Sequence, residues 1–147
     1  MKKIMLIVFA LVQAATIKVN AQEASKIKSD ISEQIKEEIL QLNAEMEKSF
    51  LSSDLLKISE FYDDDAIIMM NGKQVNGRKE LSDFWNNIKD RKDFKIVVKE
   101  LGGSGKYIDQ TGSLTWTASG EQVTKSFMMV WKRLSNYEYK IYLTGFN

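Results

Sequence analysis

The sequence lacks two residue types on which much of protein chemistry depends. None of its 147 residues is a cysteine or a histidine. Without cysteine, disulfide bonds contribute nothing to stability, and an oxidising compartment would leave the fold unchanged. Without histidine, the chain lacks the usual acid–base group near neutral pH, the commonest metal ligand and every Ser-His or Cys-His mechanism. A glycine-rich phosphate loop of the Walker or dinucleotide type is also absent.

The first 21 residues have the pattern of a secretory signal peptide. Lys2 and Lys3 precede a mostly apolar run from Ile4 to Ala15, and Val19-Asn20-Ala21 offers small residues for cleavage before Gln22. A membrane anchor is the competing interpretation, but a spanning helix needs about 20 apolar residues and this run is shorter. No cysteine follows the run, which excludes attachment through a lipidated cysteine. We therefore expect export to the periplasm or the exterior, with no membrane association after cleavage.

Cleavage would also change the formal charge of the protein. Residues 1–21 contain three lysines and no acidic residue, so their removal takes the charge from +1 to −2. A slightly acidic domain offers no basic footprint for nucleic acid. The remaining length suits one domain with its own core. We expect residues 22–30, which are polar, to form a flexible lead and residues 31–147 to form the domain.

Apolar periodicity predicts three helices in the first half of the domain. The first carries a stripe at helical spacing and a capping box of Asp30 and Glu33. Ser52-Ser53-Asp54 ends it and caps a second helix, which should include Phe61-Tyr62 and end at the acidic turn of residues 63–65. The third helix should run from about Arg78 to Lys89. The stripe of the first helix consists of Ile31, Ile35, Ile39, Leu42, Met46 and Phe50.

The rest of the chain reads as strands joined by tight turns. Ala66 to Met70 and residues 75–77 flank Asn71-Gly72, a strong hairpin signal because both turn positions favour positive φ. Four long segments follow, with turns at residues 102–105, 119–120 and 135–136, and Gly112 is expected at a bulge or kink. These segments are residues 94–101, 106–118, 122–134 and 137–147. Three helices before a mostly antiparallel sheet indicate an α+β domain whose sheet has one face covered by helices.

Several short motifs occur in an order and spacing that resemble a known superfamily. They are Asp54-Leu55, Phe61 to Ala66, Gly77-Arg78, Val130 to Arg133 and Tyr139-Lys140-Ile141. Together they resemble the SnoaL-like and ketosteroid-isomerase-like groups of the nuclear transport factor 2-like superfamily, over residues 31–147. The resemblance implies a cone-shaped α+β fold, with three N-terminal helices packed on a bent, mostly antiparallel sheet and a pocket between them. It does not name a reaction, because this fold serves enzymes, binding modules and assembly domains.

The isomerase branch of the superfamily uses residues that this chain does not have. That enzyme needs a carboxylate base and a tyrosine that donates to the developing enolate. The resemblance places Met70 at the position of the base and Met46 at the position of the tyrosine. A thioether can neither take a proton from carbon nor stabilise an oxyanion. We therefore expect no catalytic residue of this type and no steroid isomerisation.

The same resemblance implies an apolar pocket lined by methionine and aromatic side chains, which suits a small hydrophobic ligand. The expected lining residues are Met46, Tyr62, Ile68, Met70, Trp85 and Trp116. The alternative is that these side chains fill the cone as ordinary core and leave no cavity.

Three charged features have both a functional and a structural interpretation. Asp63-Asp64-Asp65 resembles a cation site, but adjacent carboxylates cannot all face one ion, so we expect a solvated turn and no metal. Arg78 could bind a ligand carboxylate at the pocket rim, although a pairing with a nearby carboxylate is the favoured alternative. Asp109 could be a half-buried acid–base group, although a position facing solvent is favoured.

Both faces of the strand from Gln122 to Leu134 carry large apolar side chains. Phe127, Met129 and Trp131 alternate with Met128 and Val130, and only one set can cover the helices. Strict alternation in the last strand places Tyr137, Tyr139, Ile141 and Leu143 on one face and Tyr142 and Phe146 on the other. We expect the uncovered set to form a homodimer through the outer sheet face.

These observations lead to one expected function and two alternatives. We expect an exported domain that binds a small hydrophobic ligand in an apolar cavity, needs no cofactor, and has no activity or an unassigned one. One alternative is a histidine-independent isomerase, cyclase or hydratase acting on a small hydrophobic substrate. The other is a structural dimerisation module. A carboxylate with a raised pKa at the cavity would favour the enzyme, an apolar lining would favour binding, and a filled cavity would favour the module.

Overall fold

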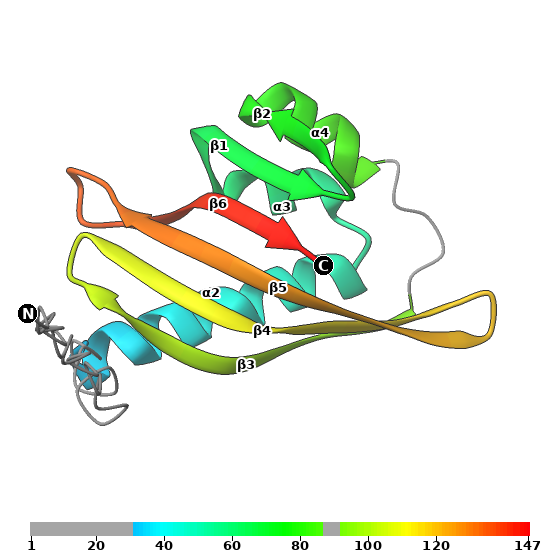
Figure 1. Ribbon diagram of the computed structural model, residues 1–147, viewed down its shortest axis with the longest axis horizontal. Coiled ribbons are helices and arrows are strands. Elements are labelled where there is room, and N and C mark those ends of the chain that lie inside the picture. Colours follow the sequence, from blue (N-terminus) through cyan, green and yellow to red (C-terminus); the bar gives the residue numbers. More distant parts are fainter. Residues whose placement is uncertain (1–30, 87–91) are drawn as a thin grey trace, which may run out of the picture.

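The computed structural model describes residues 31–86 and 92–147 of the chain. Within these residues, three helices lie against a six-stranded sheet whose strand order is β2-β1-β6-β5-β4-β3 (Figure 1). The pairs are antiparallel except β1 and β6, which run parallel. The predicted α+β class, the three helices and the mostly antiparallel sheet are confirmed.

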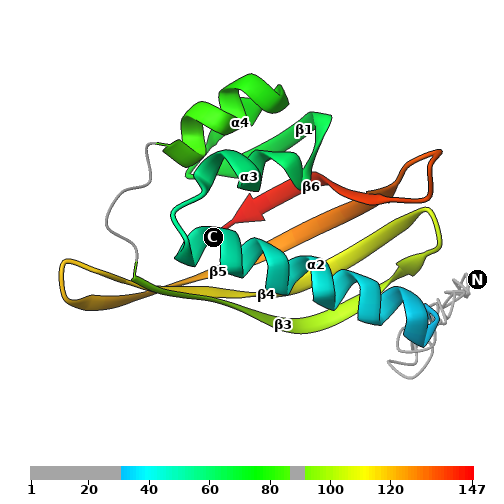
Figure 2. The same cartoon turned by 180° about the vertical axis from the view of Figure 1, so that it is seen from behind.

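Helix α2 (Glu33–Leu51) lies along the face of the sheet that the helices cover (Figure 2), here called the inner face. Its predicted stripe is directed inward, with Ile39, Met46 and Phe50 buried. The side chain of Ser32 caps the helix by accepting a hydrogen bond from Ile35 N. The cap is therefore Ser32, while the predicted Asp30 lies outside the described residues.

Helix α3 (Leu55–Glu60) is shorter than predicted because strand β1 (Tyr62–Met70) begins earlier. Tyr62 and the three aspartates that follow it belong to this strand, so the prediction that they form a helix end and a turn is wrong. Parallel pairing explains the difference: Tyr62 lies opposite Ile141 of the last strand, and Ile141 N donates to Phe61 O at 2.8 Å. Local sequence does not reveal hydrogen bonds that come from the far end of the chain.

The predicted hairpin turn joins β1 to β2 (Lys73–Asn76). Asn71 and Gly72 have φ values of 51° and 73°, which confirms the reason for predicting a two-residue turn there. Helix α4 (Gly77–Asn86) follows directly and covers β1, with Leu81 and Trp85 buried. The predicted end of this helix, residues 87–89, lies outside the described residues.

Four long strands complete the sheet: β3 (Lys92–Ser104), β4 (Tyr107–Ala118), β5 (Glu121–Arg133) and β6 (Tyr139–Phe146). The turn between β3 and β4 contains only residues 105 and 106, so Gly102 and Gly103 lie within β3 rather than in the predicted turn. Gly112 lies opposite Val98, where the register of β3 shifts. A Cβ at Gly112 would lie 2.1 Å from Val97 O, so the glycine permits a close approach of the two strands.

The two faces of β5 differ sharply in exposure. Phe127, Met129 and Trp131 are buried against the helices, whereas Met128 is 49% exposed on the outer face. Strand β6 contains one extra residue relative to β5. Ile141 pairs with Trp131 and Leu143 pairs with Val130, so Tyr142 between them has no partner position in β5. This extra residue ends the predicted alternation. Leu143 therefore lies on the outer face with Val130, and Phe146 lies on the inner face opposite Phe127.

The predicted signal peptide and flexible lead, residues 1–30, lie outside the described residues. None of the helices in residues 31–86 and 92–147 combines the length and apolar character needed to span a membrane.

Candidate functional site

An apolar cavity lies where helix α4 meets the inner face of the sheet. Its volume is about 90 Å³. We call it the Trp85 cavity, and its lining side chains are Met70, Phe84, Trp85, Leu114, Trp116, Lys125 and Phe146.

Each lining residue is placed by the element that carries it. Leu114 and Trp116 are alternate residues of β4 and so share one face of the strand. Met70 ends β1 and lies opposite Phe146 of β6 in the parallel pair. Trp85 comes from α4, and its ring contacts Phe84 edge-on with ring centroids 4.9 Å apart. Five elements therefore meet at one small apolar space.

Trp85 holds this end of the core together through further ring contacts. Its ring meets Phe50 of α2 edge-on at 5.1 Å and lies 6.1 Å from the ring of Tyr62. Phe50 in turn stacks on Phe94 at 3.9 Å. Such aromatic pairs stabilise by about 0.5–1.5 kcal/mol each beyond the area they bury. The cavity wall at Trp85 is therefore fixed rather than adaptable.

Two nitrogen donors of the lining side chains have no hydrogen-bond partner among the described residues. Trp85 Nε1 is buried and unpaired. The Lys125 amino group forms no ion pair or hydrogen bond with any residue in 31–86 or 92–147. Lys125 pairs across the sheet with Leu114 and lies on the same face of β5 as the buried Phe127, Met129 and Trp131. Lys125 is thus the charged side chain among the described residues that line this cavity.

The size of the cavity limits what it can hold. Pockets for drug-sized ligands have volumes of about 300–1,000 Å³, and an engineered cavity of about 150 Å³ holds benzene. At about 90 Å³, the Trp85 cavity suits a guest of a few heavy atoms or one end of a longer chain. It is too small to enclose a steroid.

Solved structures share the arrangement of these helices and strands. A nuclear transport factor 2-like protein of unknown function from Shewanella oneidensis MR-1 superposes with a TM-score of 0.68 at 20% sequence identity, over 76% of this chain and 97% of that one. The chain has the nuclear transport factor 2-like fold. The predicted resemblance to this superfamily is therefore confirmed at the level of the fold.

Other proteins with the nuclear transport factor 2-like fold include members of both predicted groups. A ketosteroid isomerase-like protein from Erwinia carotovora atroseptica SCRI1043 matches with a TM-score of 0.59 at 15% identity, over 69% of this chain and 85% of that one. A SnoaL-like protein from Shewanella putrefaciens CN-32 matches with a TM-score of 0.55 at 13% identity, over 73% and 86% of the two chains. Identities this low establish the fold and not a reaction. No protein-family model and no curated protein matches the sequence.

The nuclear transport factor 2-like fold brings together three of the six predicted lining residues. Met70, Trp85 and Trp116 line the Trp85 cavity. Met46, Tyr62 and Ile68 do not line it and are buried in the core. The prediction did not include four further lining residues, namely Phe84, Leu114, Lys125 and Phe146.

Tyr62 has a buried hydroxyl close to that of Thr144, the residue opposite Ile68 in β6. Burial raises the pKa of Tyr62 well above its ordinary value, and the interaction with Thr144 lowers the pKa by a smaller amount. Thr144 Oγ1 is buried and forms no hydrogen bond of regular geometry with a described residue. The Tyr62 and Thr144 hydroxyls therefore form a buried polar pair in the core, and neither residue lines the Trp85 cavity.

The predicted charged features form ion pairs or face solvent. Arg78 Nη2 lies 2.6 Å from Asp64 Oδ1, so the favoured pairing with a carboxylate is confirmed, although both side chains are largely exposed. Asp63 Oδ2 accepts a hydrogen bond at 2.6 Å from Lys132 Nζ, and this bond raises the pKa of Lys132. Asp109 is exposed on the outer face, as favoured. In residues 31–86 and 92–147 no cluster of three or more acidic side chains is arranged to hold a metal ion.

A buried hydrogen-bond network joins α2 to the sheet at Gln110, which is fully buried in β4. Gln110 Nε2 donates to Asn43 Oδ1 at 2.9 Å, and Gln110 Oε1 accepts from Asn43 Nδ2 at 3.0 Å and from Trp131 Nε1 at 2.7 Å. Asn43 Nδ2 also donates to Ile39 O at 2.8 Å. Every polar atom of the Gln110 amide has a partner, so the network is a structural contact rather than a site.

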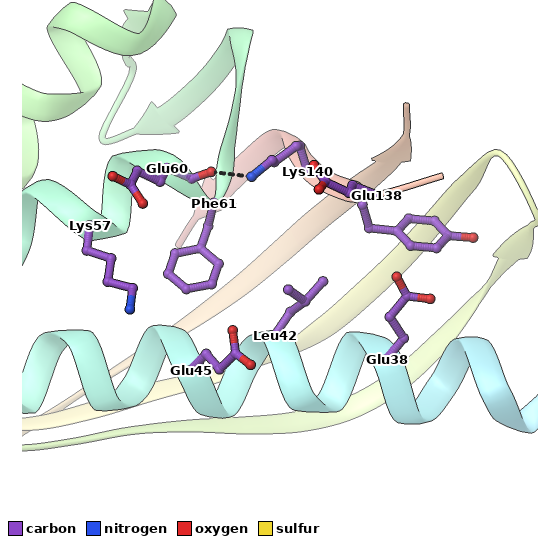
Figure 3. A pocket seen from close by; sticks show the side chains of 9 residues that line it. Glu38, Leu42, Glu45, Lys57, Glu60, Phe61, Glu138 and Lys140 are labelled. Carbon is purple, nitrogen blue, oxygen red and sulfur yellow. Dashed lines mark hydrogen bonds between the residues drawn. The ribbon is translucent and has the colours of Figure 1, made fainter. Parts of the chain in front are cut away.

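A larger hollow of about 270 Å³ lies between α2, α3 and the start of β6 (Figure 3). We call it the acidic groove, because four of its lining side chains are carboxylates. Lys140 Nζ donates to Glu60 O at 2.7 Å across one side of it. The lining residues are Glu38, Leu42, Glu45, Lys57, Glu60, Phe61, Glu138, Tyr139 and Lys140. The four glutamates are exposed and keep their hydration, so this groove is a weaker candidate than the Trp85 cavity.

Proposed function

We propose that the protein is an exported binding domain that holds a small apolar molecule in the Trp85 cavity, with no catalysis or with an unassigned activity. The observation on which this depends is the lining of the cavity. Four of its seven described lining residues present only hydrocarbon, thioether or phenyl surface, two are tryptophans, and Lys125 is the charged residue among them. Removal of an apolar guest from water is the driving force that such a lining offers.

The chemistry of the lining argues against the enzyme alternative. General acid–base catalysis needs a titratable group within hydrogen-bond reach of the proton that moves. Among the described residues, no carboxylate lines the Trp85 cavity, and Met70 stands where the resemblance implies a base. Met46 stands at the implied tyrosine position and is buried in the core. A lysine alone supplies neither the acid–base pair nor the oxyanion donors of an isomerase.

The dimerisation module is a second candidate because the cavity is small and the outer face of the sheet is apolar. Ile67 of β1, Leu143 of β6 and Val130 of β5 are neighbours in one row across three strands. Met69, Gly145 and Met128 form the adjacent row, and Met69 is 52% exposed. A two-fold axis would let this surface cover itself in a homodimer. Binding and dimerisation use opposite faces of the sheet and are compatible.

Native mass spectrometry of the protein purified from its own host tests the proposed function. The wild type should carry a co-purifying small molecule, and Leu114→Phe, which narrows the cavity, should carry less of it. The conservative outer-face control Val130→Ile should carry as much as the wild type. Absence of any bound molecule, together with no binding of small apolar probes in solution, would contradict the proposal. The same preparation reports the N-terminus, which the proposed export requires to be at or near Gln22.

A further inference from the structure

We propose that the guest of the Trp85 cavity is an organic anion, a monocarboxylate with a short apolar body, and that Lys125 binds its carboxylate. This inference rests on the proposed function, since it names the class of ligand for the same cavity. It begins from the position of Lys125, a charged residue on the same face of β5 as the buried Phe127, Met129 and Trp131.

A lysine on the inner face of a sheet needs a reason, because lysine side chains are rarely placed against apolar cores without a partner. Lys125 is half-buried, lines the cavity beside Leu114, and forms no ion pair or hydrogen bond with a described residue. Lys132, by contrast, forms an ion pair with the carboxylate of Asp63. No carboxylate of residues 31–86 and 92–147 lines the cavity, so we infer that the guest supplies the negative charge.

The hydrogen-bonding groups of the lining point to the same class of ligand. The described lining side chains include the Lys125 amino group, a nitrogen donor with no partner among the described residues, and they carry no oxygen acceptor. Trp85 Nε1 also has no hydrogen-bond partner among the described residues, but it is buried with almost no accessible surface, so Lys125 is the donor that a guest can reach. A guest that offers acceptor atoms complements such a lining, whereas a guest with hydroxyl or amine donors does not. A carboxylate offers acceptors only.

Charge and size narrow the class further. One amino group balances one negative charge, which favours a monoanion over a phosphate monoester that carries close to two charges. The volume of about 90 Å³ admits a few apolar heavy atoms, with the carboxylate at the Lys125 end of the cavity. A short aliphatic carboxylate satisfies both limits, and a long fatty acid would leave most of its chain in water.

Paired probes of equal shape test this inference on the full protein. Hexanoate and hexan-1-ol share the same apolar chain and differ in the charged head group. Titration is followed by the indole N–H resonances of the protein, of which Trp85 and Trp116 report on the cavity and Trp131 does not. The variants are Lys125→Met, which keeps the apolar stem, Lys125→Arg, which keeps the charge, and the exposed control Lys99→Met.

The wild type should bind hexanoate about tenfold more tightly than hexan-1-ol, which corresponds to about 1.4 kcal/mol for a charge-assisted hydrogen bond. Lys125→Met should lose this preference while still binding hexan-1-ol, and Lys125→Arg and Lys99→Met should keep it. Equal binding of both probes by the wild type would overturn the inference and leave the proposed function standing. A preference that survives in Lys125→Met, or that is lost in Lys99→Met, would overturn it as well. If neither probe binds, the proposed function fails together with the inference. If a Lys125 variant does not fold, the relative affinities of the wild type for hexanoate and hexan-1-ol still test the inference.

Discussion

Replacement of Gln110 by leucine should destabilise the fold strongly, although the two side chains have similar volumes. The side chain is fully buried and makes three hydrogen bonds, to Asn43 and Trp131. Gln110→Leu leaves Trp131 Nε1 and Asn43 Oδ1 buried without partners, while Asn43 Nδ2 keeps its bond to Ile39 O. Because an unsatisfied buried group costs about 1–3 kcal/mol, the loss of unfolding free energy should be about 2–6 kcal/mol.

A second substitution separates lost hydrogen bonds from general disruption of the core. In the double variant Asn43→Leu with Gln110→Leu, only the Trp131 indole N–H remains unpaired, so the loss should fall to about 1–3 kcal/mol. The double variant should therefore be more stable than Gln110→Leu alone. Urea unfolding followed by tryptophan fluorescence measures both, and the exposed control Gln122→Leu should stay within about 0.5 kcal/mol of the wild type. A double variant less stable than the single one would refute the reasoning.

Three further predictions follow from particular side chains. Met128→Lys should convert the homodimer to a monomer in light scattering with little loss of stability. Met129→Lys changes a position that is only 2% exposed and should unfold the domain. A wild type that stays monomeric at high concentration would contradict the dimer. Tyr62 has a raised pKa, so its contribution to stability is complete below about pH 10 and is lost as the pH rises further, because the unfolded state releases the proton first. Tyr62→Phe should flatten that decline in unfolding experiments above pH 10, and an unchanged slope would show that Tyr62 is not its source. Gly112→Ala places a methyl group 2.1 Å from Val97 O and should cost about 2 kcal/mol or more in thermal unfolding, whereas the open position Gly145→Ala should cost less.

The elements predicted well from the sequence are those whose signal is local. The stripe of α2 has the helical period because one side faces the sheet, and Met46 and Phe50 are buried as that period requires. Asn71-Gly72 gave the correct hairpin because both residues adopt positive φ. The order of short motifs was enough to recognise the nuclear transport factor 2-like fold, which low-identity structures confirm.

The errors come from interactions between distant parts of the chain. The aspartates after Tyr62 favour a turn locally, but pairing with β6 makes them part of a strand. Alternation cannot reveal the extra residue in β6 that places Leu143 on the outer face. The hydrogen bonds between Asn43 and Gln110 join a helix and a strand far apart in sequence, and polar residues at those positions carry no signal of burial.

The candidate site was predicted in part because its residues come from several elements. Met70 and Trp85 were found through the resemblance, and both line the cavity. Lys125 was missed because a lysine in a strand is usually assigned to the solvent side. Its position two residues before Phe127 nevertheless places it on the same face as Phe127, Met129 and Trp131, so the signal was present in the sequence.

Crystals of the protein pressurised with xenon test the central claim, that the Trp85 cavity admits an apolar guest, most directly. Xenon binds in apolar cavities without hydrogen bonds, so its position reports the cavity alone. We predict a xenon atom in contact with Met70, Trp85 and Leu114 in the wild type, at reduced occupancy in Leu114→Phe. Absence of xenon from this position in the wild type, with the side chains closed over the space, would contradict the claim.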